Sequence, residues 1–322
     1  MKKLIFILIV MLFMSLFGCS EVSTQDPITD IIIDPIDDEP IDQVNFDYLN
    51  QTLPTNMVSR FSMSNANVSW FWNGPPVFSP DGKQVYWSKI YSSWDESEIW
   101  YKTKINDNWS TEKKLTIDGL TGYLSCPVFV DNSDELYFKY LSLQMEVTIM
   151  KATRIENVWT NLETLNIPVP SEYTIDGRFS IAENRNIYIT LLAKSGMEHM
   201  KIYYSEYNNG QYGIPQAIDI LNGTTFGSGS PYIAKDESFI LYDSGPTSSY
   251  GVQDIYVSFK DESGYFTRPI NLGNQINSIE EENSAIISED GKYLFFTSKR
   301  DDDVFYTPYW IKLDEIEVFK SK

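Results

Sequence analysis

Histidine is almost absent from this chain of 322 residues, which has a single one, so a site built from several histidines is excluded. Two cysteines are too few for a zinc ribbon or a disulfide scaffold. Basic residues are also scarce, because 25 Lys and Arg stand against 45 Asp and Glu, a net charge of −20. This balance argues against nucleic acid binding through a basic surface, and the sequence indicates neither a metal site nor a cofactor.

Aromatic residues, in contrast, are abundant. The chain has 21 Tyr, 18 Phe and 8 Trp, and 42% of its residues are hydrophobic. A composition of this kind excludes a disordered chain, and the length suffices for a substantial buried core.

The N-terminal segment has the features of an export signal. Two lysines precede an uncharged apolar run of 14 residues, 4–17, which is short for a membrane span of about 20 but typical of a signal peptide. The sequence LFGC at 16–19 resembles the lipobox at which lipoprotein signal peptides are cut. The resemblance implies that residues 1–18 are removed and that Cys19 becomes the lipidated N-terminus. An ordinary signal peptide or an uncut anchor helix is the alternative.

Residues 19–45 are predicted to be a lipid-anchored acidic linker. Residues 20–45 contain eight acidic side chains, no basic one and several prolines, a composition that favours an extended tether. Ser20 follows the cysteine, where aspartate would signal retention at the inner membrane. We therefore expect a cell-envelope protein held by its lipid at the outer membrane, with the side on which it lies left open.

The remaining residues, 46–322, contain one motif five times. A strand, a turn and a second strand recur at intervals of 51, 51, 53 and 54 residues, and the copies start near Pro76, Pro127, Arg178, Pro231 and Ala285. A third strand follows, and then an aromatic residue with an aliphatic one six positions later. Four short strands per repeat are typical of a β-propeller blade. The sequence therefore predicts an all-β propeller of five four-stranded blades.

The fifth copy lacks a recognisable fourth strand, so the ring needs a strand from elsewhere. We expect residues near 55–63 to supply it and so to join the two ends of the ring. The C-terminal residues 315–319 are the competing candidate. Six blades are the alternative count, which requires residues 46–72 to form most of a further blade.

Three segments resemble a known family. FSPDG at 78–82, NLGNQINS at 271–278 and SEDGKYLFFTSKR at 288–300 are similar to the WD40-like repeats of TolB-type propellers, which are common in exported proteins of Gram-negative bacteria, notably Bacteroidetes lipoproteins. The resemblance covers about residues 50–313 and implies the fold but no activity. Asp81, Asp236 and Asp290 of these motifs are interpreted as turn residues.

Ligand binding is expected where the variable loops share one rim of the propeller. These loops carry six aromatic residues, Tyr91, Trp94, Tyr123, Tyr173, Phe226 and Tyr250. Exposed rings on a concave rim suit sugar rings or an extended peptide, whereas rings folded back onto their own blades would bind nothing. The hypothesis is a non-enzymatic binding or scaffold module for a glycan or an envelope protein.

An enzyme is the alternative, because five-bladed propellers can host glycoside hydrolases that use paired carboxylates. Asp176 and Glu282 precede first strands and are the candidates for such a pair. The single histidine, His199, is interpreted as a surface residue, and the run Asp301-Asp302-Asp303 as solvated rather than as a calcium site. Cys126 precedes an apolar strand and is interpreted as a small buried side chain.

Replacing the lipobox cysteine tests the anchor. Cys19→Ala should release the protein from membranes, because the thiol that would carry the lipid is lost. Fractionation followed by mass spectrometry of the N-terminus measures this. An unmodified N-terminus in the native protein, or cleavage at another position, would contradict a lipoprotein.

Overall fold

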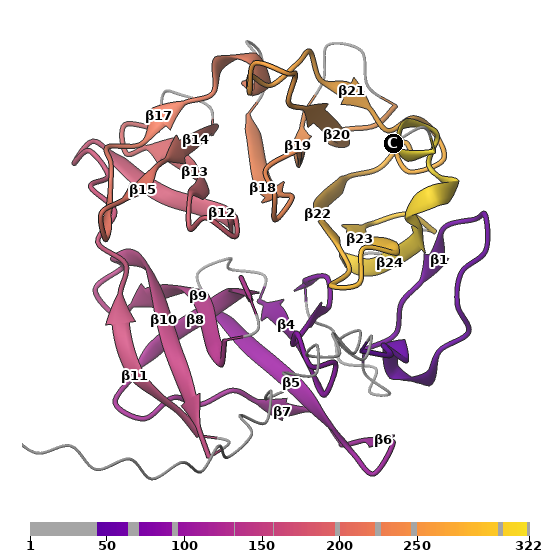
Figure 1. Cartoon of the computed structure of the whole chain (residues 1–322), viewed down its shortest axis with the longest axis horizontal. Coiled ribbons are helices and arrows are strands. Elements are labelled where there is room, and N and C mark those ends of the chain that lie inside the picture. The colour runs from indigo at the N-terminus through magenta and orange to yellow at the C-terminus, as the bar shows by residue number, and fades with distance from the viewer. Residues whose placement is uncertain are drawn as a thin grey trace, which may run out of the picture. The chain divides into compact units, whose positions relative to one another are not determined.

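The structure, a computed structural model, describes residues 44–63, 71–91, 96–131, 133–156, 158–196, 200–222, 227–245, 250–301 and 305–320. Within the compact unit Val44–Lys322 the strands form a five-bladed β-propeller, viewed along its axis in Figure 1. The predicted signal peptide, the linker as far as residue 43, and Cys19 lie outside the described residues. No helix in the described part is long and apolar enough to cross a membrane.

Each blade is an antiparallel sheet built from one repeat. Blade 1 contains β2 (Trp72–Asn73), β3 (Val77–Phe78), β4 (Gln84–Ile90), β5 (Ser97–Ile105), β6 (Asn108–Trp109) and β7 (Lys113–Lys114). Blade 2 contains β8 (Gly122–Val128), β9 (Glu135–Ser142), β10 (Val147–Ile155) and β11 (Val158–Thr164). Blade 3 contains β12 (Tyr173–Ile181), β13 (Ile187–Ala193), β14 (Lys201–Ser205), the hairpin β15 (Tyr207–Asn208) and β16 (Gln211–Tyr212), and β17 (Gln216–Ala217).

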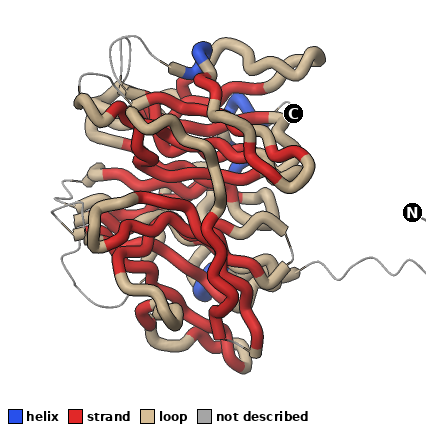
Figure 2. The backbone as a smooth tube through the Cα atoms, turned by 90° about the vertical axis from the view of Figure 1, so that its left-hand side faces the viewer, coloured by secondary structure: helices blue, strands red, loops and turns tan. Residues whose placement is uncertain are grey.

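The last two blades follow the same plan. Blade 4 contains β18 (Ser228–Ile233), β19 (Phe239–Ser244), β20 (Asp254–Phe259) and β21 (Ile270–Asn271). Blade 5 contains β22 (Glu282–Ile287), β23 (Tyr293–Ser298), β24 (Thr307–Lys312) and β1 (Ser59–Arg60). The short 3₁₀ helices are η1 (Tyr48–Asn50), η2 (Asp219–Leu221), η3 (Leu313–Glu315) and η4 (Glu317–Phe319). Seen edge-on, the strands run from one face of the ring to the other, with loops at both faces (Figure 2).

The turn between the first two strands confirms the interpretation of the motif aspartates. In blade 1, Asp81 accepts hydrogen bonds from the Ser79 hydroxyl at 2.6 Å and from the Lys83 N–H at 3.0 Å. Gly82 has a φ of 65°, a conformation that glycine adopts without steric cost. The aspartate is thus occupied in holding the turn.

The fourth strand is less regular than predicted. Blade 2 has it as the seven-residue β11, whereas it is interrupted in blades 1, 3 and 4. In blades 3 and 4 the interruption contains Pro215 and Pro269, and proline has no N–H for the ladder. The aliphatic residue of the predicted pair nevertheless keeps its place, because its N–H donates to a third-strand carbonyl in four blades. These bonds are Leu115 to Ile99 at 2.7 Å, Leu165 to Ile149 at 2.9 Å, Ile218 to Ile202 at 3.0 Å and Leu272 to Ile255 at 3.1 Å.

The ring closes as predicted. β1 pairs with β24, with Ser59 opposite Trp310 and Arg60 opposite Tyr309, so the N-terminal segment is the outer strand of blade 5. The C-terminal candidate is wrong, because its residues form η3 and η4 instead of a strand. Phe319 in η4 packs edge-on against Phe239 of blade 4, with ring centroids 5.3 Å apart.

A buried aromatic cluster fixes this closure. Phe61, next to β1, is 1% exposed and packs edge-on against Phe295 and Trp310, with both centroid distances 5.1 Å. Tyr48 is buried beside them and donates its hydroxyl hydrogen to Asp290 at 2.5 Å. The N-terminal segment is therefore held by its side chains as well as by the two-residue strand.

Truncating Phe61 tests the closure. Phe61→Ala should lower the free energy of unfolding by roughly 3–5 kcal/mol, the usual cost of removing a buried ring. Urea denaturation measures this. Tyr265→Ala is the control, because Tyr265 is 73% exposed, and its effect should stay within about 0.5 kcal/mol. Equal losses in the two variants would contradict the closure.

Candidate functional site

Loops gather at one face of the ring, which we call the loop-bearing rim. It consists of the hairpins between second and third strands and the linkers that lead from one blade to the next. Large hydrophobic side chains are exposed on it in several blades, namely Tyr91, Leu143, Met145, Tyr250, Val252 and Ile279. Exposed apolar groups that share one face are a feature of interaction surfaces. Others, among them Ile155, Val158 and Tyr265, lie outside this rim.

The predicted rim aromatics differ in their exposure. Tyr91 and Tyr250 are exposed, as a ligand surface requires, whereas Tyr123 and Tyr173 are half-buried in first strands. The Tyr173 ring lies 5.9 Å from that of Tyr203 and borders a cavity of about 250 Å³ between blades 2 and 3. The other two predicted residues, Trp94 and Phe226, lie outside the described residues, as does His199.

Glu282, one of the two candidate carboxylates, is fully buried at the start of β22. It accepts hydrogen bonds from the hydroxyls of Ser278 and Ser298, both at 2.6 Å, and from the Ser278 N–H at 2.7 Å. Arg300 lies 3.2 Å from the same carboxylate. These contacts connect the preceding linker to the strands of blade 5, so the carboxylate has a structural role.

Asp176, the other candidate, is half-buried in β12. Its Oδ1 accepts the N–H of the next residue, Gly177, at 2.7 Å. The inner strand of blade 4, β18, lies between the strands that carry Asp176 and Glu282. The two carboxylates therefore do not come from neighbouring blades.

An irregularity recurs in the innermost strand of the blades. The register with the second strand shifts within β8, β12, β18 and β22, and in each a residue has positive φ: Cys126, Gly177, Ser230 and Ser284. In blade 1 the segment Gly74-Pro75-Pro76 separates β2 from β3 at this place. Such β-bulges bend a strand and leave backbone groups without ladder partners.

The preceding blade supplies partners for three of these bulges through a polar side chain of its second strand. The bonds are Cys126 N–H to Ser88 Oγ at 2.8 Å, Lys139 Nζ to the Gly177 carbonyl at 2.9 Å, and Ser284 N–H to Asp243 Oδ2 at 3.1 Å. Sequence reasoning missed these residues. Ser88, Lys139 and Asp243 occupy the same position of their repeats, which Thr190 and Thr297 occupy in the other two. A polar residue at one fixed position of an otherwise apolar strand is the signal that could have identified them.

Asp243 is the most perturbed of these groups. Burial raises its pKa to about 6, although hydrogen bonds from the Ser284 N–H, the Ser230 side chain and Gln253 act in the opposite direction. Burial disfavours the charged form of a carboxyl group, and these donors compensate it only in part.

Metal binding has no support among the described residues, which contain no group of three or more His, Cys, Asp or Glu arranged to hold an ion. Asp301 accepts a hydrogen bond from the Tyr309 hydroxyl at 3.2 Å, and Asp302 and Asp303 are outside the described residues. Cys126 is buried, as its sequence context predicted.

Comparison with known proteins gives similarity in structure alone. No family model matches the sequence, and no curated protein is significantly similar to it. TolB from Acinetobacter baumannii is 14% identical with a TM-score of 0.44, over 74% of this chain and 54% of that one, so this chain spans about half of that protein. A putative TolB from Agrobacterium tumefaciens is 14% identical with a TM-score of 0.47, over 76% of this chain and 78% of that one.

Glycoside hydrolases occur among the similar structures as well. The catalytic domain of the Coprinopsis cinerea GH62 α-L-arabinofuranosidase is 11% identical with a TM-score of 0.49, over 77% of this chain and 93% of that one. The neighbours are thus a mixture of TolB-like propellers and propeller hydrolases. At these identities the likeness concerns the fold only.

The raised pKa of Asp243 gives a prediction for stability against pH. In unfolded chains an aspartate titrates near pH 4, and the pKa of Asp243 is raised to about 6. The folded state thus binds more protons between these values, and ionisation destabilises it as the pH rises. Asp243→Asn should therefore gain stability relative to the native protein from pH 4 to 6, by about 2 kcal/mol, and keep a constant difference above this range.

Urea unfolding of both proteins at a series of pH values measures the difference. Asp236→Asn is the control, because hydrogen bonds from Ser238 lower the pKa of Asp236. The stability that Asp236 contributes is present at neutral pH and is lost as the pH falls, which is the opposite trend. A flat difference between Asp243→Asn and the native protein from pH 4 to 7 would contradict the assignment.

Proposed function

We propose that this protein is a non-enzymatic binding module of the cell envelope, held at the outer membrane by a lipid on Cys19, which binds a protein partner through its loop-bearing rim. The observation that carries the proposal is the group of exposed hydrophobic side chains on this rim. They come from blades 1, 2 and 4 and from the linker before blade 5, so one partner could contact several of them at once.

The chemistry of the rim favours a protein over a glycan. Leu143, Met145 and Ile279 are aliphatic and more than half exposed, and such side chains have no polar group for sugar hydroxyls. Sugar rings stack on aromatic faces, and among the described residues only Tyr91 and Tyr250 expose one on this rim. Methionine and aromatic residues are, in turn, enriched at protein interfaces.

The environment of the candidate carboxylates supports a non-enzymatic role. A general acid or nucleophile must reach its substrate, whereas the Glu282 carboxylate is fully buried and bonded to Ser278 and Ser298. Asp176 is bonded to the bulge in its own strand. The glycoside hydrolase alternative would need both groups to leave these contacts.

The predicted anchor suits such a module. The acidic linker, residues 19–45, would extend by self-repulsion and hold the propeller away from the membrane surface. The rim would then be accessible to a partner in the same compartment.

Substitution on the rim tests the proposal. The double variant Tyr250→Ala with Ile279→Ser should lose at least tenfold in affinity for the partner, because central apolar side chains dominate such interfaces. Its melting temperature should stay unchanged, since both side chains are exposed. Capture from envelope extracts identifies the partner, and titration of the purified partner measures the affinity.

Tyr265→Ala is the matched control, because Tyr265 is exposed on the hairpin after β20, away from the rim. Partner binding that survives the rim substitutions, or fails equally in the control, would contradict the proposal. Saturable binding on a glycan array would assign the rim to carbohydrate instead. Turnover of a glycoside by the native protein that Asp176→Asn or Glu282→Gln abolishes in a variant that still folds would establish the enzyme.

A further inference from the structure

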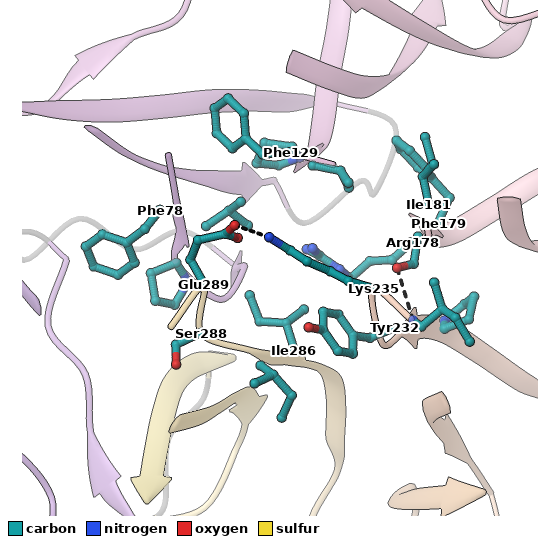
Figure 3. Close-up of a pocket in the computed structure, with 18 residues that line it drawn as sticks. Phe78, Phe129, Arg178, Phe179, Ile181, Tyr232, Lys235, Ile286, Ser288 and Glu289 are labelled. Carbon is teal, nitrogen blue, oxygen red and sulfur yellow. Dashed lines mark hydrogen bonds and ion pairs between the residues drawn. The ribbon is translucent and has the colours of Figure 1, made fainter. Parts of the chain in front are cut away.

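A second candidate site lies in the central channel and is independent of the rim. All five innermost strands border a cavity of about 60 Å³ there, close to the turns between first and second strands (Figure 3). Its walls are largely apolar and include Phe78, Phe129, Phe179, Tyr232 and Ile286. A water molecule needs roughly 10–15 Å³ by this measure, so a small molecule of a few atoms can enter.

Arg178 brings a positive charge into this cavity. It projects from β12 toward the middle of the pocket (Figure 3) and is only 4% exposed. The other blades have Pro76, Pro127, Pro231 and Ala285 at the equivalent repeat position. Arg178 is thus the one charged residue at a position that is apolar in the other four blades, and the repeat fold does not require a charge there.

The guanidinium of Arg178 lacks the partners that a buried cation normally has. Its Nη1 is buried and makes no hydrogen bond, and among the described residues no carboxylate lies within ion-pair distance of the guanidinium. Asp243 is close enough to act on it electrostatically, but the Asp243 oxygens already accept from Gln253 and the Ser284 N–H. Burial lowers the pKa of Arg178, and the electrostatic effect of Asp243 opposes this only in part.

The second cation of the pocket is compensated. Lys235 forms an ion pair with Glu289, which comes from the next blade (Figure 3). The Lys235 side chain is 45% exposed, so this pair lies where the cavity meets solvent. Entry past an exposed ion pair is feasible, because such pairs contribute little stability.

We propose that the channel cavity binds a short-chain monocarboxylate, with Arg178 as its anion-binding residue. The planar guanidinium matches a carboxylate in shape and can donate two parallel hydrogen bonds to it. One negative charge balances the one cation of the pocket that forms no ion pair, whereas a dianion would leave an excess charge in an apolar cavity. The aromatic and aliphatic walls suit a short alkyl tail, which a chloride ion lacks.

Propionate is a suitable probe because its few atoms fit the cavity. At constant ionic strength, propionate at about ten times its dissociation constant should raise the melting temperature by roughly 3 °C. Propionamide, neutral and of the same shape, should cause no shift, and chloride should cause none beyond its effect on ionic strength. Saturation-transfer NMR on the propionate methyl group measures binding directly.

Arg178→Met tests the residue. It replaces a buried charge that forms no ion pair with an apolar side chain, so the variant without ligand should melt at the same temperature as the native protein or higher. Both the propionate shift and the NMR signal should disappear. Arg268→Met is the matched control, because Arg268 is exposed on blade 4, and it should keep both responses.

A further variant keeps the test decisive if Arg178→Met does not fold. Arg178→Lys retains the charge but loses the planar pair of donors, and it should weaken propionate binding at least tenfold. Four results would overturn the proposal: no response of the native protein, an equal response to chloride, an equal response to propionamide, or a propionate response that survives Arg178→Met.

Discussion

The structure depends on how each blade holds the next one near the central axis. An innermost strand with a bulge has backbone groups that its own sheet cannot satisfy, and unsatisfied buried groups are costly. Ser88, Lys139 and Asp243 supply the missing partners from the preceding blade. The bulge that weakens its own sheet therefore links this sheet to the preceding blade. These hydrogen bonds fix how the two blades are aligned, which hydrophobic packing alone does not.

This arrangement separates stability from recognition. The polar side chains near the axis are largely consumed by the bulges and by strand ends, as the buried Glu282 illustrates. Two groups of side chains without such duties serve the proposed binding sites, the exposed ones on the rim loops and Arg178 in the channel. Both places lie where the repeats differ from one another, whereas the shared positions serve the fold.

Much of this fold could be predicted from the sequence because one motif recurs at regular intervals along the chain. Five copies in register indicate five blades, and the missing fourth strand of the last copy indicates the closure by residues 55–63, now seen as β1. The interrupted fourth strands were not predicted. The prediction used only the spacing of the aromatic and aliphatic residues, and this spacing does not show that Pro215 and Pro269 remove hydrogen bonds between the third and fourth strands. The exposure of Tyr123 or Glu282 depends on contacts distant in sequence, and residue type alone does not encode it.

The pairing of β1 with β24 has a consequence for the order of folding. The strand that completes the ring is the first to be synthesised, and its partner is the last. Blades 1 to 4 can form during synthesis from contacts that are local in sequence. The buried aromatic cluster around Phe61 can form only after Trp310 has been synthesised. Until that moment both ends of the ring are open strand edges, at which a strand of another chain can pair.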